Sequence, residues 1–269
     1  MKQDHLMSLA EDLLIDQQEV DNFIIPDDSV NIRLAEDYEA DLIKKLNTKP
    51  EDEGCYLPWA ETHSKVLIRP GELSIWGGFN GHKKSIMTSH CALDFVHQNQ
   101  TVCIASFEMH PVITLKRMAS QAIGNQTPTD EAISGFFKSL KGRLYLYDQQ
   151  NTVPVERVKR MAGLCGNKLR LDHLFIDSLM KCGLSPDDYG GQKEFINELH
   201  AIAKDTGMHI HLVAHMRKPP KDLRYVPDRY DISGGSDITN QADNVFIVWT
   251  DMEKKAEGKS LSTSRIRTL

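Results

Sequence analysis

Residues 73–85 read LSIWGGFNGHKKS, and the fold can be inferred from this segment. A short apolar run is followed by a glycine-rich loop, a Lys-Ser pair and a helical pattern that continues to residue 98. This order is the context of a phosphate-binding loop, in which glycines allow backbone N–H groups to point at phosphates. The segment therefore predicts a nucleotide-binding site at the end of a buried strand.

The residue types in this loop indicate individual roles. Lys84 is expected to reach the β- and γ-phosphates of a nucleotide, the Ser85 hydroxyl to bind Mg²⁺, and the helix N-terminus to add its positive dipole end. The pattern G-x-x-x-x-G-K-[ST] is broken at one position, because Lys83 replaces its second glycine. If this position requires a positive φ, a lysine there costs about 1 kcal/mol. The candidate nucleotide-binding residues are Gly78, Asn80, Gly81, His82, Lys83, Lys84 and Ser85.

Outside this loop, short apolar runs alternate with helical patterns up to residue 249. The predicted strands are 73–77, 101–106, 143–147, 172–177, 208–213 and 244–249. The predicted helices are 84–98, 111–123, 129–140, 154–164 and 191–206. This alternation predicts an α/β fold with a mainly parallel central sheet flanked by helices.

Polar residues stand at the ends of three predicted strands, where parallel sheets place their chemistry. Glu108 follows the strand at 101–106 and is a candidate to activate water, with a surface glutamate as the alternative. Asp177 ends an apolar run and is a candidate to hold Mg²⁺. His215 follows the strand at 208–213 and is a candidate to contact the γ-phosphate, with a structural histidine as the alternative.

The order of these segments resembles that of one protein family. After RPGEL at 69–73 and the phosphate loop come SFEM at 106–109, LFID at 174–177, VAHMRK at 213–218, SGGSDI at 233–238 and QAD at 241–243. This order resembles the RecA-like ATPase domain of DnaB-type replicative helicases, and most of all their phage and mitochondrial primase–helicase branch. The resemblance covers about residues 58–250. It implies ATP and Mg²⁺ as ligands, a hexameric ring of identical subunits, and movement along single-stranded DNA.

The resemblance also implies roles for single residues. The matching positions are the nucleotide and Mg²⁺ ligands Lys84 and Ser85, the catalytic Glu108, the metal-binding Asp177 and the γ-phosphate sensor His215. The segment 217–237 matches loops that face the central channel of the ring. Its candidates for contacts with DNA phosphates are Arg217, Lys218, Lys221, Arg224 and Arg229, with a solvated loop as the alternative.

Three parts of the chain are expected: an acidic helical arm at 1–57, the RecA-like domain at 58–250 and a polar tail at 251–269. The arm has helical patterns over 5–20 and 32–46, whose apolar stripe packs either on its own domain or, as the resemblance implies, on a neighbouring subunit. Relatives carry Lys-x-Arg on a further strand, as a finger that reaches the neighbour's γ-phosphate. Arg265 and Arg267 have this spacing, but no strand is predicted around them.

Composition and charge narrow the class of protein. The chain has 269 residues, and residues 1–60 carry 15 acidic and 5 basic side chains, whereas residues 61–269 carry 23 and 27. The mildly basic body permits nucleic-acid binding. The five cysteines form no C-x-x-C pair, which argues against a zinc finger and against a disulfide scaffold. With neither an 18-residue apolar run nor a secretory signal, we expect a cytoplasmic protein that does not enter a membrane.

Three functions are compatible with these observations. The leading hypothesis is the ATPase and translocase domain of a replicative DNA helicase, of phage or prophage origin. The second is a module that binds nucleotide and DNA but is no motor, because it lacks the trans arginine finger. The third is a RecA-fold ATPase that acts on something other than DNA.

Overall fold

The computed structural model describes residues 34–49, 53–185, 187–217, 225–234, 236–250 and 264–268. The chain forms two compact units, Met1–Lys49 and Pro50–Leu269. In the first unit, a 3₁₀ turn, η2 (Ala35–Tyr38), leads into α3 (Glu39–Asn47). This confirms the C-terminal part of the helix predicted at 32–46, whereas the helix predicted at 5–20 lies outside the described residues. Leu42, Ile43 and Leu46 on α3 are exposed.

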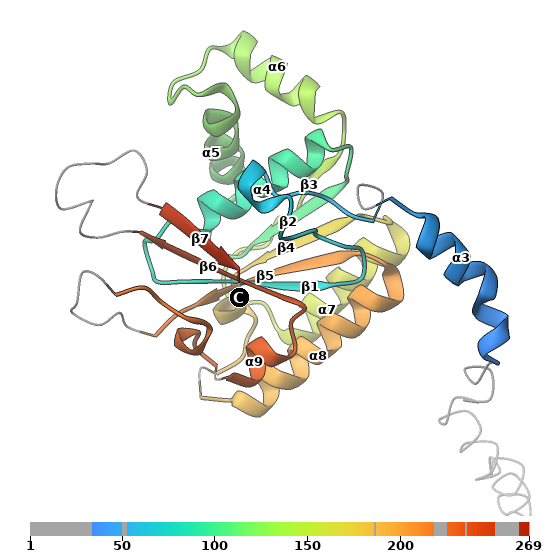
Figure 1. Ribbon diagram of the computed structural model, residues 1–269. Helices are drawn as coiled ribbons and strands as arrows, with labels where there is room; N and C mark the ends of the chain where they lie inside the picture. Colours follow the sequence, from blue (N-terminus) through green and yellow to red (C-terminus); the bar gives the residue numbers. More distant parts are fainter. Residues whose placement is uncertain are drawn as a thin grey trace, which may run out of the picture. The chain divides into compact units, whose positions relative to one another are not determined.

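The second unit is built around one seven-stranded sheet, in the order β3-β2-β4-β5-β1-β6-β7 (Figure 1). Six strands run parallel, and these confirm the six predicted strands. Their bounds are β1 Leu73–Gly78, β2 Val102–Ser106, β3 Leu144–Leu146, β4 His173–Asp177, β5 His209–His215 and β6 Asn244–Thr250. The fold is that of a RecA-like P-loop NTPase core, as predicted.

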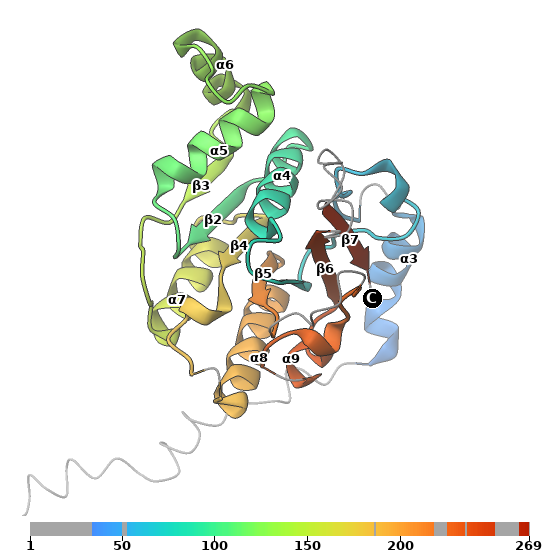
Figure 2. The same cartoon turned by 90° about the vertical axis from the view of Figure 1, so that its left-hand side faces the viewer.

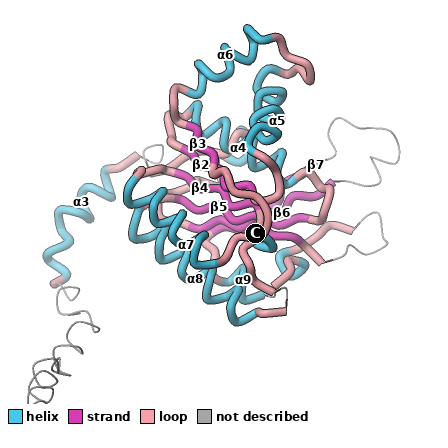
Figure 3. Tube along the Cα trace, turned by 180° about the vertical axis from the view of Figure 1, so that it is seen from behind, coloured by secondary structure: helices cyan, strands magenta, loops and turns pink. Residues whose placement is uncertain are grey.

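Helices cover both faces of the sheet (Figures 1 and 3). α4 (Lys84–His97) and α5 (Pro111–Ile123) lie on one face, and Figure 2 shows α5 and α6 (Asp130–Leu140) on the β3 side. The other face carries α7 (Val155–Gly163), which a π-helical turn extends over Leu164–Lys168, and α8 (Tyr189–Thr206). The remaining short helices are η4 (Ala60–Thr62), η6 (Leu179–Lys181), η7 (Arg229–Asp231) and α9 (Ser236–Asn240).

The alternation of side chains along the strands divides the core in two. In β1, Leu73 and Ile75 join the apolar cluster on the α7 and α8 face, whereas Trp76 joins the cluster on the α4 face. The strands that sit between two neighbours are almost fully buried, which explains their continuous apolar runs.

A chain of buried polar side chains crosses the sheet on the α4 face. Trp76 Nε1 donates to His211 Nδ1 at 3.2 Å. His211 Nε2 lies 3.3 Å from His173 Nδ1, and His173 Nε2 lies 3.4 Å from Cys55 Sγ. Because an indole N–H can only donate, a neutral His211 must donate in turn to His173, and His173 to Cys55. His209, also buried, contacts the carbonyl of Arg69 at 2.6 Å. These histidines are therefore bonded within the core.

The C-terminal boundary differs from the expected one. Residues 264–268, which the sequence analysis placed in a polar tail, form β7 (Ser264–Thr268), antiparallel to β6. The prediction failed because β7 is an edge strand with the pattern Ser-Arg-Ile-Arg-Thr, which lacks the continuous apolar run of the central strands. The N-terminal boundary also shifts, since Cys55 and Leu57 belong to the core of the second unit.

Candidate functional site

The loop between β1 and α4 has the backbone geometry that the sequence raised as a question. Lys83, the residue before α4, has φ 65° and ψ 25°, and Gly81 has φ 77°. Position 83 therefore requires the left-handed conformation, which confirms that a lysine occupies a site suited to glycine. The missing glycine is a real departure from the motif, and the loop keeps its shape in spite of it.

Gly78 is required by packing as well as by the loop. A Cβ atom at this position would lie 2.5 Å from the carbonyl oxygen of Val248 on β6 and 2.9 Å from Cγ of Lys84. No real Cβ atom tolerates such contacts, so only glycine allows β1 to end this close to β6 and to the lysine.

Lys84 lies folded against the loop that precedes it. Its Nζ donates to the carbonyls of Gly78 at 2.8 Å and Phe79 at 3.2 Å, and the side chain is buried. Burial lowers the pKa of the ammonium group, while the nearby carboxylates of Asp177 and Glu108 act in the opposite direction. The cation is thus held at the mouth of the loop by two neutral carbonyl groups.

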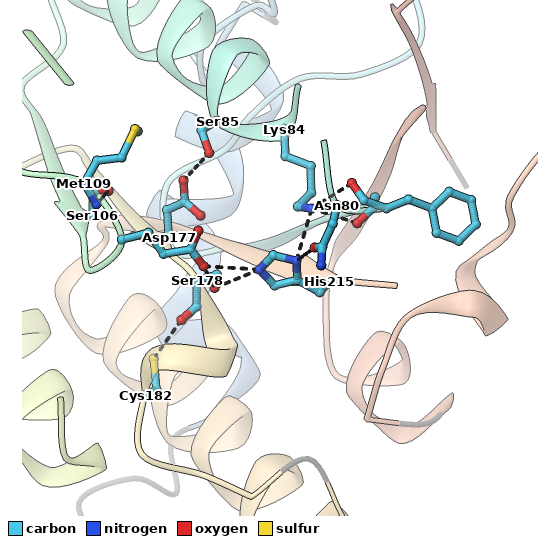
Figure 4. A network of polar contacts seen from close by, with 12 residues as sticks. Asn80, Lys84, Ser85, Ser106, Met109, Asp177, Ser178, Cys182 and His215 are labelled. Carbon is cyan, nitrogen blue, oxygen red and sulfur yellow. Dashed lines mark hydrogen bonds and ion pairs between the residues drawn. The ribbon is translucent and has the colours of Figure 1, made fainter. Parts of the chain in front are cut away.

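Ser85 and Asp177 bring two oxygen ligands together. The Ser85 hydroxyl donates to Oδ2 of Asp177 at 2.6 Å, from the first turn of α4 to the end of β4 (Figure 4). Asp177 is buried, and this burial raises the pKa of its carboxyl group. A hydroxyl and a carboxylate are hard oxygen donors of the kind that Mg²⁺ accepts. The donor set therefore fits a magnesium ion.

Glu108 and His215 meet through a third residue, Ser178 (Figure 4). The Ser178 hydroxyl lies 3.0 Å from Glu108 Oε1 and 3.1 Å from His215 Nε2, and Nε2 lies 3.3 Å from the same Oε1. These contacts lower the pKa of Glu108 to about 2, with the hydrogen bond from His215 as the largest cause. On its other side, His215 Nδ1 contacts Asn80 and lies 3.4 Å from Lys84 Nζ.

All these groups open into one cleft of about 1220 Å³ between the loop, α5 and η6. Most of the predicted nucleotide-site residues line it, together with Glu108, Asp177 and His215. Sequence reasoning missed Ser178 and three basic residues of the opposite wall, Lys116, Arg117 and Lys181. The adjacent pair on α5 was visible as a basic dipeptide, but only the fold shows that the helix faces the loop.

Several predicted residues lie elsewhere. His82 Nδ1 accepts from the backbone N–H of Thr250, so its ring is turned toward β6. Arg217 is exposed, and the Arg229 guanidinium stacks over the ring of Tyr230 at 5.0 Å. Neither arginine lines the cleft. The other three predicted DNA-binding residues, Lys218, Lys221 and Arg224, lie outside the described residues.

Comparisons with known proteins agree with this architecture. A family model described as an AAA domain matches residues 51–221. A solved structure of a helicase ATPase domain is similar in fold, with a TM-score of 0.70 and 11% sequence identity. The match covers 88% of this chain and 94% of that one. At this identity the likeness bears on the fold alone. Among the described residues, no helix is long and apolar enough to cross a membrane.

Proposed function

Because the chain belongs to the AAA domain family, we propose that it is a helicase-type ATPase that couples ATP hydrolysis to movement on single-stranded DNA. The observation that carries the proposal is the meeting of three elements in one cleft. The phosphate loop, the Ser85–Asp177 pair and the Glu108–His215 pair all border the same space. This is the set of groups that phosphoryl transfer to water requires.

The loop residues supply nucleotide binding in this proposal. Backbone N–H groups of the loop and the N-terminus of α4 attract the phosphates. Lys84 exchanges its two carbonyl partners for phosphate oxygens, which costs little because those carbonyls are neutral acceptors. Ser85 and Asp177 would hold Mg²⁺, which when bound neutralises charge on the phosphates.

Glu108 is the proposed general base. With a pKa of about 2 its carboxylate is ionised at neutral pH, so it can orient a water molecule and accept its proton. His215, which joins Glu108 to Lys84 and Asn80, is the proposed sensor of the γ-phosphate. Its position between base and lysine supports a role in which phosphate contact and water activation are linked.

The DNA and the oligomer belong to the finer part of the proposal. Arg217, Lys218, Lys221, Arg224 and Arg229 are the proposed phosphate contacts, and identical subunits are proposed to form a ring around the strand. β7 supports a motor over a module without a finger, because Arg265 and Arg267 occupy a strand directly beside β6, in register with Trp249 and Ile247. The phage and mitochondrial helicase branch, which the order of motifs favours, is proposed as the origin.

The test is the ATP hydrolysis rate of the purified chain, with and without single-stranded DNA, at two salt concentrations. We expect hydrolysis that DNA stimulates, with apparent DNA affinity falling steeply as salt rises. Hydrolysis without stimulation and without salt-dependent binding would favour an ATPase that acts on another substrate. ATP binding without any hydrolysis would favour the non-motor module.

A further inference from the structure

Ser178 occupies a central position that the sequence patterns did not reveal. It directly follows Asp177 at the end of β4 and is completely buried. Its backbone is fixed from two sides, since its carbonyl accepts from the N–H of Lys181 at 2.9 Å and from the Cys182 thiol at 3.6 Å. The hydroxyl is therefore presented to the cleft by a rigid piece of backbone.

The protons on this group can be assigned from the contacts. A serine hydroxyl has one proton to donate, and the ionised Glu108 can only accept. The Ser178 proton therefore goes to Glu108 Oε1 at 3.0 Å, and the Ser178 oxygen must accept from His215 Nε2 at 3.1 Å. It follows that His215 carries a proton on Nε2, which is also the nitrogen that lies 3.3 Å from Glu108.

The three groups form a closed triangle of hydrogen bonds. Each corner comes from a different element: Glu108 from the segment after β2, Ser178 from the end of β4, and His215 from the end of β5. The charged groups that also face Glu108 are Lys84, Asp177 and Lys181. Of the corners only Ser178 is wholly buried, so it is the fixed point against which the other two are oriented.

We propose that Ser178 is a positioning residue for ATP hydrolysis, which holds the Glu108 carboxylate in one orientation and keeps the proton of His215 on Nε2. The inference rests on the proposed function. Ser178 touches neither nucleotide nor water in this account and acts only through its two partners. Loss of its hydroxyl frees the carboxylate to rotate, and a misplacement of about 1 Å near the chemistry can cost up to about 100-fold in rate.

The test is Ser178→Ala, a change that removes one oxygen and adds no bulk. We expect kcat for ATP to fall roughly 10- to 100-fold, while the Kd for a fluorescent ADP analogue stays within about twofold. Ser74→Ala is the matched control. Ser74 is also fully buried and its Oγ lies 2.7 Å from a histidine, His209, but it is remote from the cleft in the register of β1. Its kcat should equal that of the unmodified chain.

A double-mutant cycle separates positioning from a structural role. In a Glu108→Gln background, Ser178→Ala should lower the residual rate by less than about twofold, because the base that it orients has already been removed. The proposal is overturned if Ser178→Ala keeps the kcat of the unmodified chain, if it loses nucleotide binding as much as kcat, or if the two losses multiply in the double variant.

A spectroscopic readout keeps this inference separate from the proposed function. The ¹⁵N chemical shifts of His215 should show a protonated Nε2 in the unmodified chain, and Ser178→Ala should shift the Nε2 signal. If the unmodified chain hydrolyses no ATP, the proposed function fails while this readout still tests the triangle. A His215 that carries its only proton on Nδ1 in the unmodified chain would overturn the positioning role.

Discussion

Replacing Lys83 by glycine should stabilise the chain, although it removes a side chain. Lys83 has φ 65° and ψ 25°, a conformation that costs a residue with a Cβ atom about 1–2 kcal/mol. Glycine avoids this cost but loses more freedom on folding, by about 0.5–1 kcal/mol relative to alanine. The difference predicts that Lys83→Gly raises the free energy of unfolding by about 0.5–1 kcal/mol. Lys83→Val should lower it by at least about 1 kcal/mol, because β-branched residues tolerate positive φ least.

Urea denaturation followed by circular dichroism measures these differences. The matched control is Lys138→Gly on α6, where the exposed lysine has helical backbone angles. There the same substitution should lower the free energy of unfolding by about 1 kcal/mol. Opposite signs at positions 83 and 138 are the predicted result. If both glycine variants lose stability to the same extent, the left-handed geometry at position 83 is not what distinguishes it, and the reasoning is refuted.

Two further predictions concern stability. Burial lowers the pKa of His209 from 6.5 to about 4, and it also lowers the pKa values of His173 and His211. The unfolded chain takes up these protons first as the pH falls below 6.5, so stability is full above that pH and should drop by about 2 kcal/mol for His209 alone by pH 5; a flat urea midpoint between pH 7 and 5 would contradict this. Gly78→Ala should destabilise by about 1–3 kcal/mol, since its Cβ would meet the Val248 carbonyl, whereas Gly81→Ala, with open space around it, should cost only about 1 kcal/mol of backbone strain. Equal urea midpoints for the two alanine variants would show that the contact with β6 is relieved at little cost.

The sequence predicted the central strands and the phosphate loop well because buried parallel strands leave strong local signals. The six apolar runs are continuous, and each is followed by a break and a helical pattern. The left-handed conformation at Lys83 was also deducible, because the motif itself prescribes glycine there. These are features in which local chemistry and the final structure agree.

The rest depends on contacts between distant segments. β7 has no apolar run of its own, and its strand conformation is supported by backbone pairing with β6. Ser178 gains its importance only when Glu108 and His215, distant in sequence, come within 3.0 and 3.1 Å of its hydroxyl. His82 was grouped with the nucleotide site by proximity in sequence, but the turn directs its ring to Thr250 on β6. No local pattern carries information of this kind.

The central claim is that Glu108 activates water in a cleft that binds ATP. The most direct measurement is single-turnover ATP hydrolysis by the full chain and by Glu108→Gln, with nucleotide affinity determined for both. Glutamine keeps the size of the side chain and removes the proton acceptor. The account predicts a loss of roughly 100-fold or more in the hydrolysis rate, with ATP affinity within about threefold of the unmodified chain. Equal hydrolysis rates in the two proteins would contradict it.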